Sequence, residues 1–299
     1  MPDIASELAR ILELARAQLP DPTGWSLVVR PSWLDRFYFG PGVSRMVQAL
    51  PTSELGGSAA LSVTGSDDGG VITVTSMLRP GFEDLWTAQR AWIERHVADG
   101  GSTTSVRVFS ECLTDAETCR WAAAGFDLVF EELAMERDLS DTEGSPEVRW
   151  PAGSTVLEWG DAAAAASFGV YEAAFRDRPG FPGWSRSEWL ERLTGDADFV
   201  PETSVSVLLD GVPAGFVVCS RGWIDQIGVA PAHRRIGLAT AIVTEATCRM
   251  RATGTRVARL HVNANNPEAR ATWRHLGWRE SGRRGRFERL VMPKVRRTV

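Results

Sequence analysis

The stretch from residue 227 to residue 242 combines residue types that could hold a phosphate group. It reads IGVAPAHRRIGLATAI, with a turn between two apolar runs. The first amides of a helix have no partner inside the helix, and the helix dipole gives them partial positive charge. Gly237 and Ala239 leave such amides uncovered, while Arg234 and Arg235 add charge and donors. The turn therefore predicts a cradle for a pyrophosphate.

The spacing of these residues also narrows the kind of nucleotide site. Arg234-x-x-Gly237-x-Ala239 is neither a Walker A loop nor a GxGxxG fingerprint. It resembles the Gln/Arg-x-x-Gly-x-Gly/Ala signature of the GNAT N-acetyltransferase superfamily, which grips the pyrophosphate of acetyl-CoA. Residues 265–278, NNPEARATWRHLGW, resemble the downstream segment of that superfamily. The layout of the whole chain is similar to that of tandem GNAT proteins of the mycothiol synthase type, which have a weakened N-terminal copy and an active C-terminal one.

The resemblance implies acetyl-CoA, or another acyl-CoA, as cofactor. By that resemblance the thioester lies beside the strand that ends at Val229, backbone groups near Ile227 pair with the pantetheine arm, and the Val229 N–H polarises the thioester carbonyl. Asn266 would hold the far side of the cofactor, although its place before a proline is also good helix-capping chemistry. The expected cofactor-binding residues are Ile227, Val229, Arg234, Arg235, Gly237, Leu238, Ala239, Thr240, Asn266 and Trp273.

Acyl transfer to an amine needs a base and a donor for the oxyanion. An alkyl amine has a pKa of ~10, so it arrives protonated and a base must remove the proton. We favour Asp225 as that base, with the Val229 amide as the oxyanion donor. Strand alternation predicts that Asp225, Ile227 and Val229 share one face, and a plain surface carboxylate is the alternative interpretation of Asp225. Glu172 and Asp177 are weaker candidates.

The residue at the usual place of a catalytic acid is a tryptophan. Many members of the superfamily have a tyrosine four residues before the Gly-aromatic pair, where this chain has Trp273. An indole cannot give up its proton. Either the thiolate leaves without acid help, since a thiol has a pKa of only ~8.5, or the chain binds acyl-CoA without turning it over. The predicted function is an N-acetyltransferase for a small-molecule amine, and the alternative is a non-catalytic acyl-CoA-binding or regulatory protein.

The elements that must position these residues occur in both halves of the chain. A strand, a long helix, a second strand, a short helix with a tryptophan and a closing strand follow one another twice. Gly125-Phe126 matches Gly277-Trp278, and Trp121 matches Trp273, each 152 positions on. The pattern predicts an α/β fold of mixed sheets in two tandem GNAT-like domains. The predicted domains are a degenerate N-terminal copy at 1–139, a linker at 140–148 and a C-terminal copy with the acyl-CoA site at 149–299.

The N-terminal copy lacks the predicted phosphate cradle. Glu83 and Asp84 stand where phosphates would bind, and carboxylates there would repel the ligand. Thr114 occupies the place of Asn266. We therefore expect no CoA site in residues 1–139, and we expect that half to support the fold or to wall the acceptor cleft.

Charge and composition bear on the remaining functional classes. The net charge of −5 argues against nucleic acid as the main partner; the arginine-rich segment 283–297 reads as a solvated edge strand. No run approaches the ~20 apolar residues of a membrane helix, and residues 4–19 read as an amphipathic helix and not as a signal peptide. The four cysteines form no CxxC pair and no zinc-ligand spacing. We expect a cytoplasmic protein with reduced thiols and no metal; the acceptor, the acyl chain length and the oligomeric state stay open.

Overall fold

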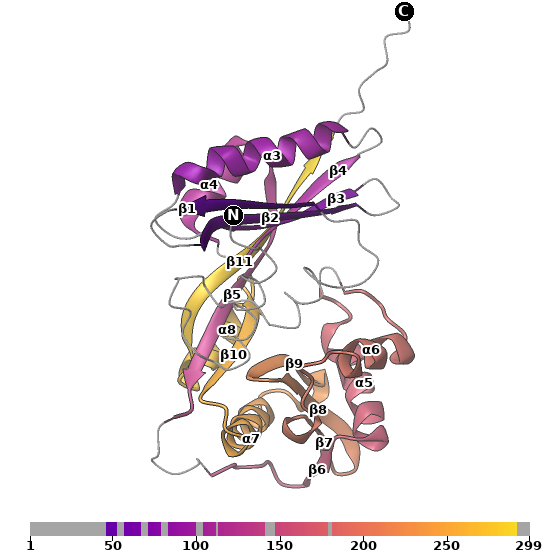
Figure 1. Ribbon diagram of the computed structural model, residues 1–299. Coiled ribbons are helices and arrows are strands. Elements are labelled where there is room, and N and C mark those ends of the chain that lie inside the picture. The colour runs from indigo at the N-terminus through magenta and orange to yellow at the C-terminus, as the bar shows by residue number, and fades with distance from the viewer. Residues whose placement is uncertain are drawn as a thin grey trace, which may run out of the picture. The chain divides into compact units, whose positions relative to one another are not determined.

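The computed structural model forms two compact units (Figure 1). Unit 1 comprises residues 1–134, 262–270 and 280–299, and unit 2 comprises residues 135–261 and 271–279. The structure describes residues 46–52, 57–66, 71–78, 83–99, 104–111, 113–140, 147–178 and 181–291. The helix predicted at 4–19 lies outside the described residues, as does most of the predicted linker.

Unit 1 is a mixed sheet covered by helices. Its strands follow the order β1-β2-β3-β4-β11-β5, with β3 and β4 parallel and β4 and β11 antiparallel. Helix α3 contacts β1, β2 and β3. The elements are β1 (Met46–Thr52), β2 (Gly57–Ser66), β3 (Val71–Leu78), the 3-10 turn η1 (Glu83–Leu85), α3 (Trp86–Asp99), β4 (Ser105–Ser110), α4 (Asp115–Ala123), and most of β5 (Asp127–Asp138) and β11 (Arg279–Leu290).

Unit 2 contains further strands of the same mixed sheet, with helices on both faces. Its strand order is β10-β9-β8-β7-β6. A Cβ on Gly215 would meet side chains of α7, whereas one on Gly228 would meet Ala174 of α5. The elements are β6 (Ser154–Glu158), α5 (Asp161–Phe175), α6 (Arg186–Thr194), η2 (Pro201–Thr203), β7 (Val205–Leu209), β8 (Val212–Ser220), β9 (Trp223–Val229), η3 (Pro231–His233), α7 (Leu238–Ala252), β10 (Val257–Asn263) and α8 (Pro267–His275), of which β10 and α8 extend into unit 1.

Local sequence signals account for the ends of several elements. Helix α6 begins with a full capping box, in which Ser185 and Glu188 bond each other's backbone amides. Strands β7 and β8 form a hairpin, because Asp210 (φ 50°) and Gly211 (φ 79°) form the left-handed pair that joins them. Gly254, at φ 87°, follows the C-cap of α7.

The elements recur with the 152-residue spacing found in the sequence. The short helices begin at Asp115 and Pro267, and the long helices begin at Trp86 and Leu238. The same offset relates the first residues of β3 and β9, of β4 and β10, and of β5 and β11.

Side-chain geometry repeats as well. Trp121 meets Phe126 edge to face at 5.0 Å between ring centroids, and Trp273 meets Trp278 in the same way at 5.2 Å. These matching contacts show that both tryptophans pack within their own units.

The prediction of a solvated edge strand near residue 283 is wrong. Strand β11 lies between β4 and β5, so both of its edges are paired. Its arginines are held by carboxylates, because packed strands bring acidic partners within reach. The pairs are Arg283 with Glu131 at 3.1 Å, Arg284 with Glu132 at 2.6 Å and Arg289 with Glu94 at 2.8 Å. The described arginines of this segment therefore offer little free charge to a nucleic acid.

A buried acid in α4 makes the stability of the protein depend on pH. Glu117 is 3% exposed, and burial raises its pKa to about 7, although the Trp121 indole donates to its carboxylate over 3.1 Å. The folded chain thus holds this proton more tightly than the unfolded chain, whose reference pKa is 4.5. This contribution is complete below that reference value and is lost as the pH rises towards the folded pKa.

We expect Glu117→Gln to remove this pH dependence, because glutamine stays neutral and keeps an oxygen for the indole. Between about pH 5 and about pH 8 the free energy of unfolding of the wild type should fall by roughly 2–3 kcal/mol relative to the variant. Urea unfolding at both pH values measures the difference. Equal slopes against pH for the two proteins would contradict the assignment.

Candidate active site

Strand β9 exposes main-chain groups because β10 pairs with only the first part of it. On one edge it pairs with β8 along its whole length. On the other edge its register with β10 covers only Trp223 and Ile224, opposite Arg259 and Leu260. Among the described strands, none pairs with this outer edge of β9 from Asp225 to its end.

The outer edge presents the amides of two residues named by the sequence. The Ala230 amide donates to the Ala214 carbonyl over 2.9 Å, at the pair that follows Val229. Hydrogen-bonded and non-hydrogen-bonded pairs alternate along an antiparallel ladder. The N–H and C=O of Val229, and those of Ile227 two residues earlier, therefore point away from β8 and towards the open edge.

The turn after β9 leaves the start of α7 uncovered. Arg235 and Gly237 both have left-handed φ values, 67° and 86°, and such residues curl successive amides into an anion-binding concavity. Gly237 is the N-cap of α7 and supplies no side-chain bond, and a Cβ built on it would meet nothing within 4 Å. The next three residues, Leu238, Ala239 and Thr240, carry amides with no carbonyl in a preceding turn. An anion could approach these amides directly.

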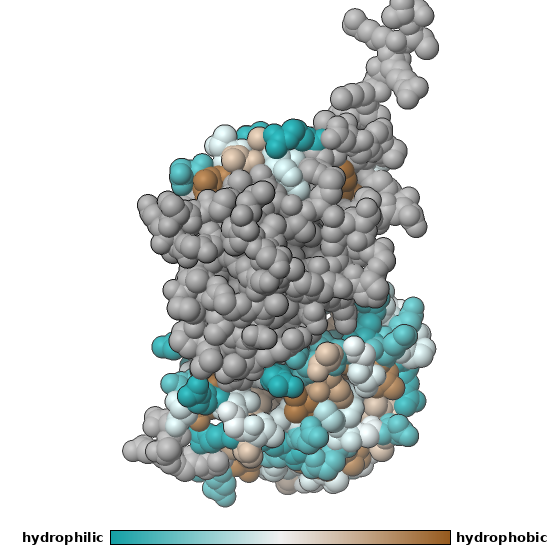
Figure 2. Space-filling view, in the orientation of Figure 1, coloured by the Kyte–Doolittle hydropathy of each residue, from teal (hydrophilic) through white to brown (hydrophobic). Residues whose placement is uncertain are grey.

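The two arginines of the turn carry exposed positive charge. The Nε of Arg234 donates to the Val229 carbonyl over 3.3 Å, which ties its side chain to the outer edge of β9. Arg235 is exposed and forms no ion pair with any described residue. Ile236, which follows them, is 47% exposed, and Figure 2 shows such apolar residues interspersed with hydrophilic ones on the described surface of unit 2. The turn is thus positively charged without a carboxylate of its own.

Asp225 does not lie on the face that strand alternation predicted. The register slips at this residue, since Gln226 pairs with Val218 but Ile224 pairs with Cys219, and Asp225 is the extra residue of a β-bulge. Its two carboxylate oxygens accept from the Ser220 hydroxyl at 2.8 and 2.7 Å. The bulge therefore turns its side chain towards Ser220.

The two faces of β8 show on which side of the sheet Asp225 and Ile227 lie. Ser220 alternates with Phe216 and Val218, which belong to the apolar cluster beneath α5 and α6. Ile227 pairs with Val217 and so lies on the opposite face, with α7. The predicted shared face was wrong because a bulge interrupts the period of two, and the pattern of residue types carries no sign of a bulge.

Two polar residues near the bulge were missed by the sequence analysis. Ser220 is 2% exposed and holds Asp225. Gln226 accepts a hydrogen bond from the Trp189 indole over 3.0 Å, which links β9 to α6. A serine at the end of one strand and a glutamine inside the next are common surface residues, so the sequence offered no signal for either.

The other predicted residues occupy well-defined local environments. Asn266 caps α8, since its Oδ1 accepts from the Ala269 amide over 3.1 Å. Trp273 is 7% exposed and packs against Trp278. Glu172 forms an ion pair with Arg176 at 3.7 Å. Phe175, Phe181 and Trp184 pack against the α5–α6 apolar cluster, which includes Trp189.

The corresponding strand of unit 1 is paired on both edges for most of the matching stretch, residues 73–77. Strand β3 pairs with β4 through six successive residues, from Val71 to Ser76, and with β2 on its other side. Leu85 stands where unit 2 has Gly237, 152 positions later. The geometry that opens β9 is therefore absent from the described residues of unit 1.

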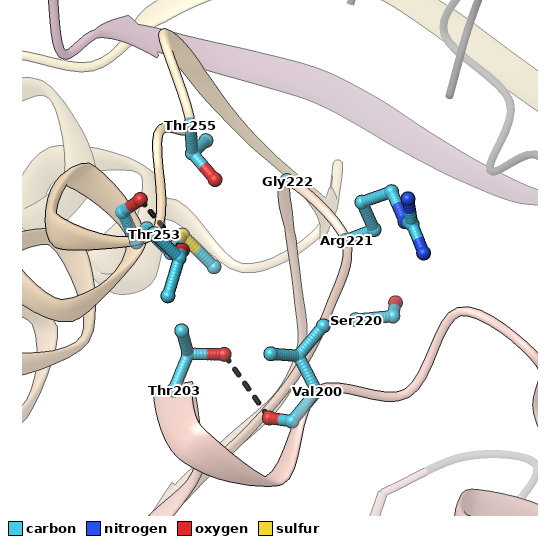
Figure 3. Close-up of a pocket in the computed structure, with 8 residues that line it drawn as sticks. Val200, Thr203, Ser220, Arg221, Gly222, Thr253 and Thr255 are labelled. Atoms are coloured by element: carbon cyan, nitrogen blue, oxygen red, sulfur yellow. Dashed lines mark hydrogen bonds between the residues drawn. The ribbon is translucent and has the colours of Figure 1, made fainter. Parts of the chain in front are cut away.

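A cavity of about 190 Å³ lies in unit 2 at the other end of β9 (Figure 3). It is lined by Val200, Thr203, Ser220, Arg221, Gly222, Met250, Thr253 and Thr255. Figure 3 shows the Arg221 guanidinium turned away from the cavity. The cavity lies at the start of β9, so it is separate from the turn that precedes α7.

Among the described residues, no cluster of His, Cys, Asp and Glu suits a metal ion, and no helix is long and apolar enough to cross a bilayer.

Comparison with known proteins identifies the region that contains this geometry. Residues 169–278 match the model of the acetyltransferase (GNAT) family. The chain is 30% identical over 110 residues to an uncharacterized N-acetyltransferase of Methanocaldococcus jannaschii, an alignment covering 32% of this chain and 46% of that protein. The chain thus spans about half the length of this curated relative.

Two solved structures resemble the chain over nearly its whole length. A GCN5-related N-acetyltransferase from Sphaerobacter thermophilus superposes with a TM-score of 0.68 at 20% identity, covering 96% of this chain and 93% of that one. A tandem GNAT protein from the clavulanic acid biosynthesis pathway gives a TM-score of 0.59 at 18% identity, covering 96% and 95%. At these identities the likeness shows that the fold is GNAT-like.

Proposed function

We propose that the chain is an acyl-CoA-dependent N-acetyltransferase, because residues 169–278 match the model of the acetyltransferase (GNAT) family. It moves an acetyl group to the amine of a small molecule by direct attack on the thioester. The observation that carries this proposal is the open outer edge of β9, which leads into the uncovered start of α7.

The residues of unit 2 suit a cofactor with a diphosphate and an amide-rich arm. The amides of Leu238, Ala239 and Thr240 and the two neighbouring arginines would bind the diphosphate. The outer edge at Ile227 and Val229 would pair with the amides of the pantetheine arm, as an added strand pairs with a sheet edge. Acetyl-CoA supplies the activated acyl group, and the chain supplies position and charge.

The chemistry at the bulge follows from these positions. The amine nitrogen bonds to the thioester carbon, the C–S bond breaks, and the sulfur leaves as thiolate. The Val229 amide donates to the carbonyl oxygen as negative charge develops there. Asp225, held by Ser220, takes the proton that the amine must lose. Trp273 packs against Trp278 and supplies no acid, so the thiolate leaves unassisted or takes its proton from water.

We also propose that the chain consists of two GNAT-like repeats, at 1–139 and 149–299, of which only the second binds acyl-CoA. The 152-residue recurrence of elements supports two repeats. The continuous pairing of β3 with β4 supports a first repeat without a cofactor cleft.

Release of free thiol from acetyl-CoA in the presence of a panel of small amines tests the activity. We expect release that depends on the amine and a product that is heavier by one acetyl group. Tight binding of acetyl-CoA with no release over a broad panel would favour the alternative, a non-catalytic acyl-CoA-binding protein, for which the packed Trp273 is the supporting observation.

A further inference from the structure

We infer that the two repeats exchange their last strands, so that the first repeat completes the unit that holds the candidate active site. This inference rests on the 152-residue recurrence and on contacts within each unit, and not on the proposed activity. It gives a role to a repeat that lacks a cofactor cleft.

Unit 1 is completed by the last strand of the second repeat. Strand β11 pairs antiparallel with β4 through six residues, from Gly285 opposite Ser110 to Leu290 opposite Ser105. Phe287 of β11 is fully buried, and the other buried members of the same apolar cluster all lie between residues 72 and 126. The core of unit 1 thus takes one of its large side chains from 161 positions beyond its own last member, Phe126.

Charged contacts also hold β11 in unit 1. Arg289 bonds both carboxylate oxygens of Glu94 at 2.8 Å and the Ala124 carbonyl at 3.1 Å. Its guanidinium lies 4.3 Å from the centre of the Phe126 ring. A bidentate arginine that also covers an aromatic face gives geometric specificity, so the strand is bound in one register.

Unit 2 receives the matching segment of the first repeat. Residues 135–140 belong to this unit, and the Leu139 amide donates to the Arg256 carbonyl over 2.7 Å beside β10. Met135 stands 152 positions before Phe287 and is likewise fully buried. Glu136 pairs with Arg279 at 2.9 Å and with Arg259 at 3.9 Å.

The contacts in the two units are related by the repeat itself. Arg107 pairs with Glu288 in unit 1, and Arg259 pairs with Glu136 in unit 2. Each residue of one pair is 152 positions from a residue of the other, with the strands interchanged. Two glycines show the same exchange.

The glycines that close the short helices lie beside arginines of the exchanged strands. A Cβ on Gly125 would lie 3.7 Å from Arg289, and one on Gly277 would lie 4.0 Å from Arg137. Gly125 and Gly277 are 152 positions apart, as are Arg137 and Arg289. A repeat that kept its own last strand would instead place Arg137 beside Gly125.

The exchange means that neither repeat has a complete sheet alone. Without β11, β4 would present an unpaired edge, and unit 1 would lose Phe287 from its core. Without residues 135–140, β10 would be the edge strand of the unit with the candidate site. Unpaired edges invite association with other chains. The partner that fits each edge is the closing strand of the other repeat.

Cysteine pairs in the intact protein test this exchange. A protease site placed within residues 141–146, outside the described residues, allows the purified full chain to be cut between the repeats. Arg107 and Glu288 are directly opposite, so Arg107→Cys with Glu288→Cys should form a disulfide across the strands. After cutting, we expect most of the two fragments to remain linked on a non-reducing denaturing gel.

The control pair is Arg107→Cys with Glu136→Cys, since Glu136 would face Arg107 if the first repeat kept its own strand. Both cysteines of this pair lie on the first fragment, so their disulfide is measured by counting free thiols in the uncut protein. We expect both thiols to stay free, and the single variants report any contribution of the native cysteines. Both substitutions of the first pair remove an ion pair whose side chains are more than one third exposed, so the fold should tolerate them. Linkage of the control pair, with none between Arg107→Cys and Glu288→Cys, would overturn the inference.

Discussion

Gly237→Glu should reduce the affinity for acetyl-CoA by about 100-fold or more, a loss of about 2.7 kcal/mol in binding free energy. The space next to the Gly237 Cα is open, so a glutamate side chain can be accommodated without a clash. It would place a carboxylate at the start of α7, where the diphosphate is proposed to bind. Like charges about 4 Å apart near a protein surface repel by about 4 kcal/mol. Isothermal titration calorimetry measures the change.

Gly254→Glu is the matched control for this variant. Gly254 has φ 87° against 86° for Gly237, and a Cβ there would also meet nothing within 4 Å. Both variants carry the same backbone strain and the same added charge, but Gly254 lies at the opposite end of α7. Its affinity for acetyl-CoA should match that of the wild type. Equal losses in the two variants would show that the binding site does not depend on the start of α7.

Asp225→Asn should lower kcat/KM for acetyl transfer by roughly 10²–10⁴-fold, the usual contribution of a general base. Asparagine keeps an oxygen that accepts from the Ser220 hydroxyl, so the bulge should persist. Because Asp225 is proposed to act on the acceptor amine, the affinity for acetyl-CoA should stay within about two-fold, which separates a chemical role from a structural one. Steady-state kinetics together with calorimetry measure both quantities.

Asp177→Asn is the control, since Asp177 is an exposed carboxylate of the same unit just beyond α5. It should leave kcat/KM unchanged, and so should Trp273→Phe if that ring only packs against Trp278. If Asp225→Asn retains full activity while Asp177→Asn loses it, the base has been assigned to the wrong residue. A loss in Trp273→Phe would show that this ring does more than pack against Trp278.

The sequence was a good guide to elements whose ends have local causes. Ser185 and Glu188 predict a helix start, and Asp210-Gly211 predicts a hairpin, because helix capping and left-handed turns depend on a few neighbouring residues. The turn at Arg234 and Gly237 was predictable for the same reason. The recurrence at 152 residues also followed from the sequence, since the same order of elements, with matching tryptophans and Gly-aromatic pairs, occurs in each repeat.

Features that depend on strand pairing could not be predicted in the same way. The bulge at Asp225 arises from the register of β9 against β8, and the partial pairing of β9 with β10 is set by residues far apart in the chain. The arginines of β11 looked solvated because their partners, such as Glu94 and Glu131, lie more than 150 positions away. A pattern of residue types gives the faces of a strand but not its neighbours.

The central claim is that the outer edge of β9 and the first turn of α7 hold an acyl-CoA. Amide hydrogen exchange with and without acetyl-CoA tests it most directly, because both parts of the site are backbone amides. We predict slower exchange in peptides covering residues 225–241 and no change in the matching segment of the first repeat, residues 73–89. Unchanged exchange at 225–241 under saturating acetyl-CoA, or protection confined to the first repeat, would contradict the account.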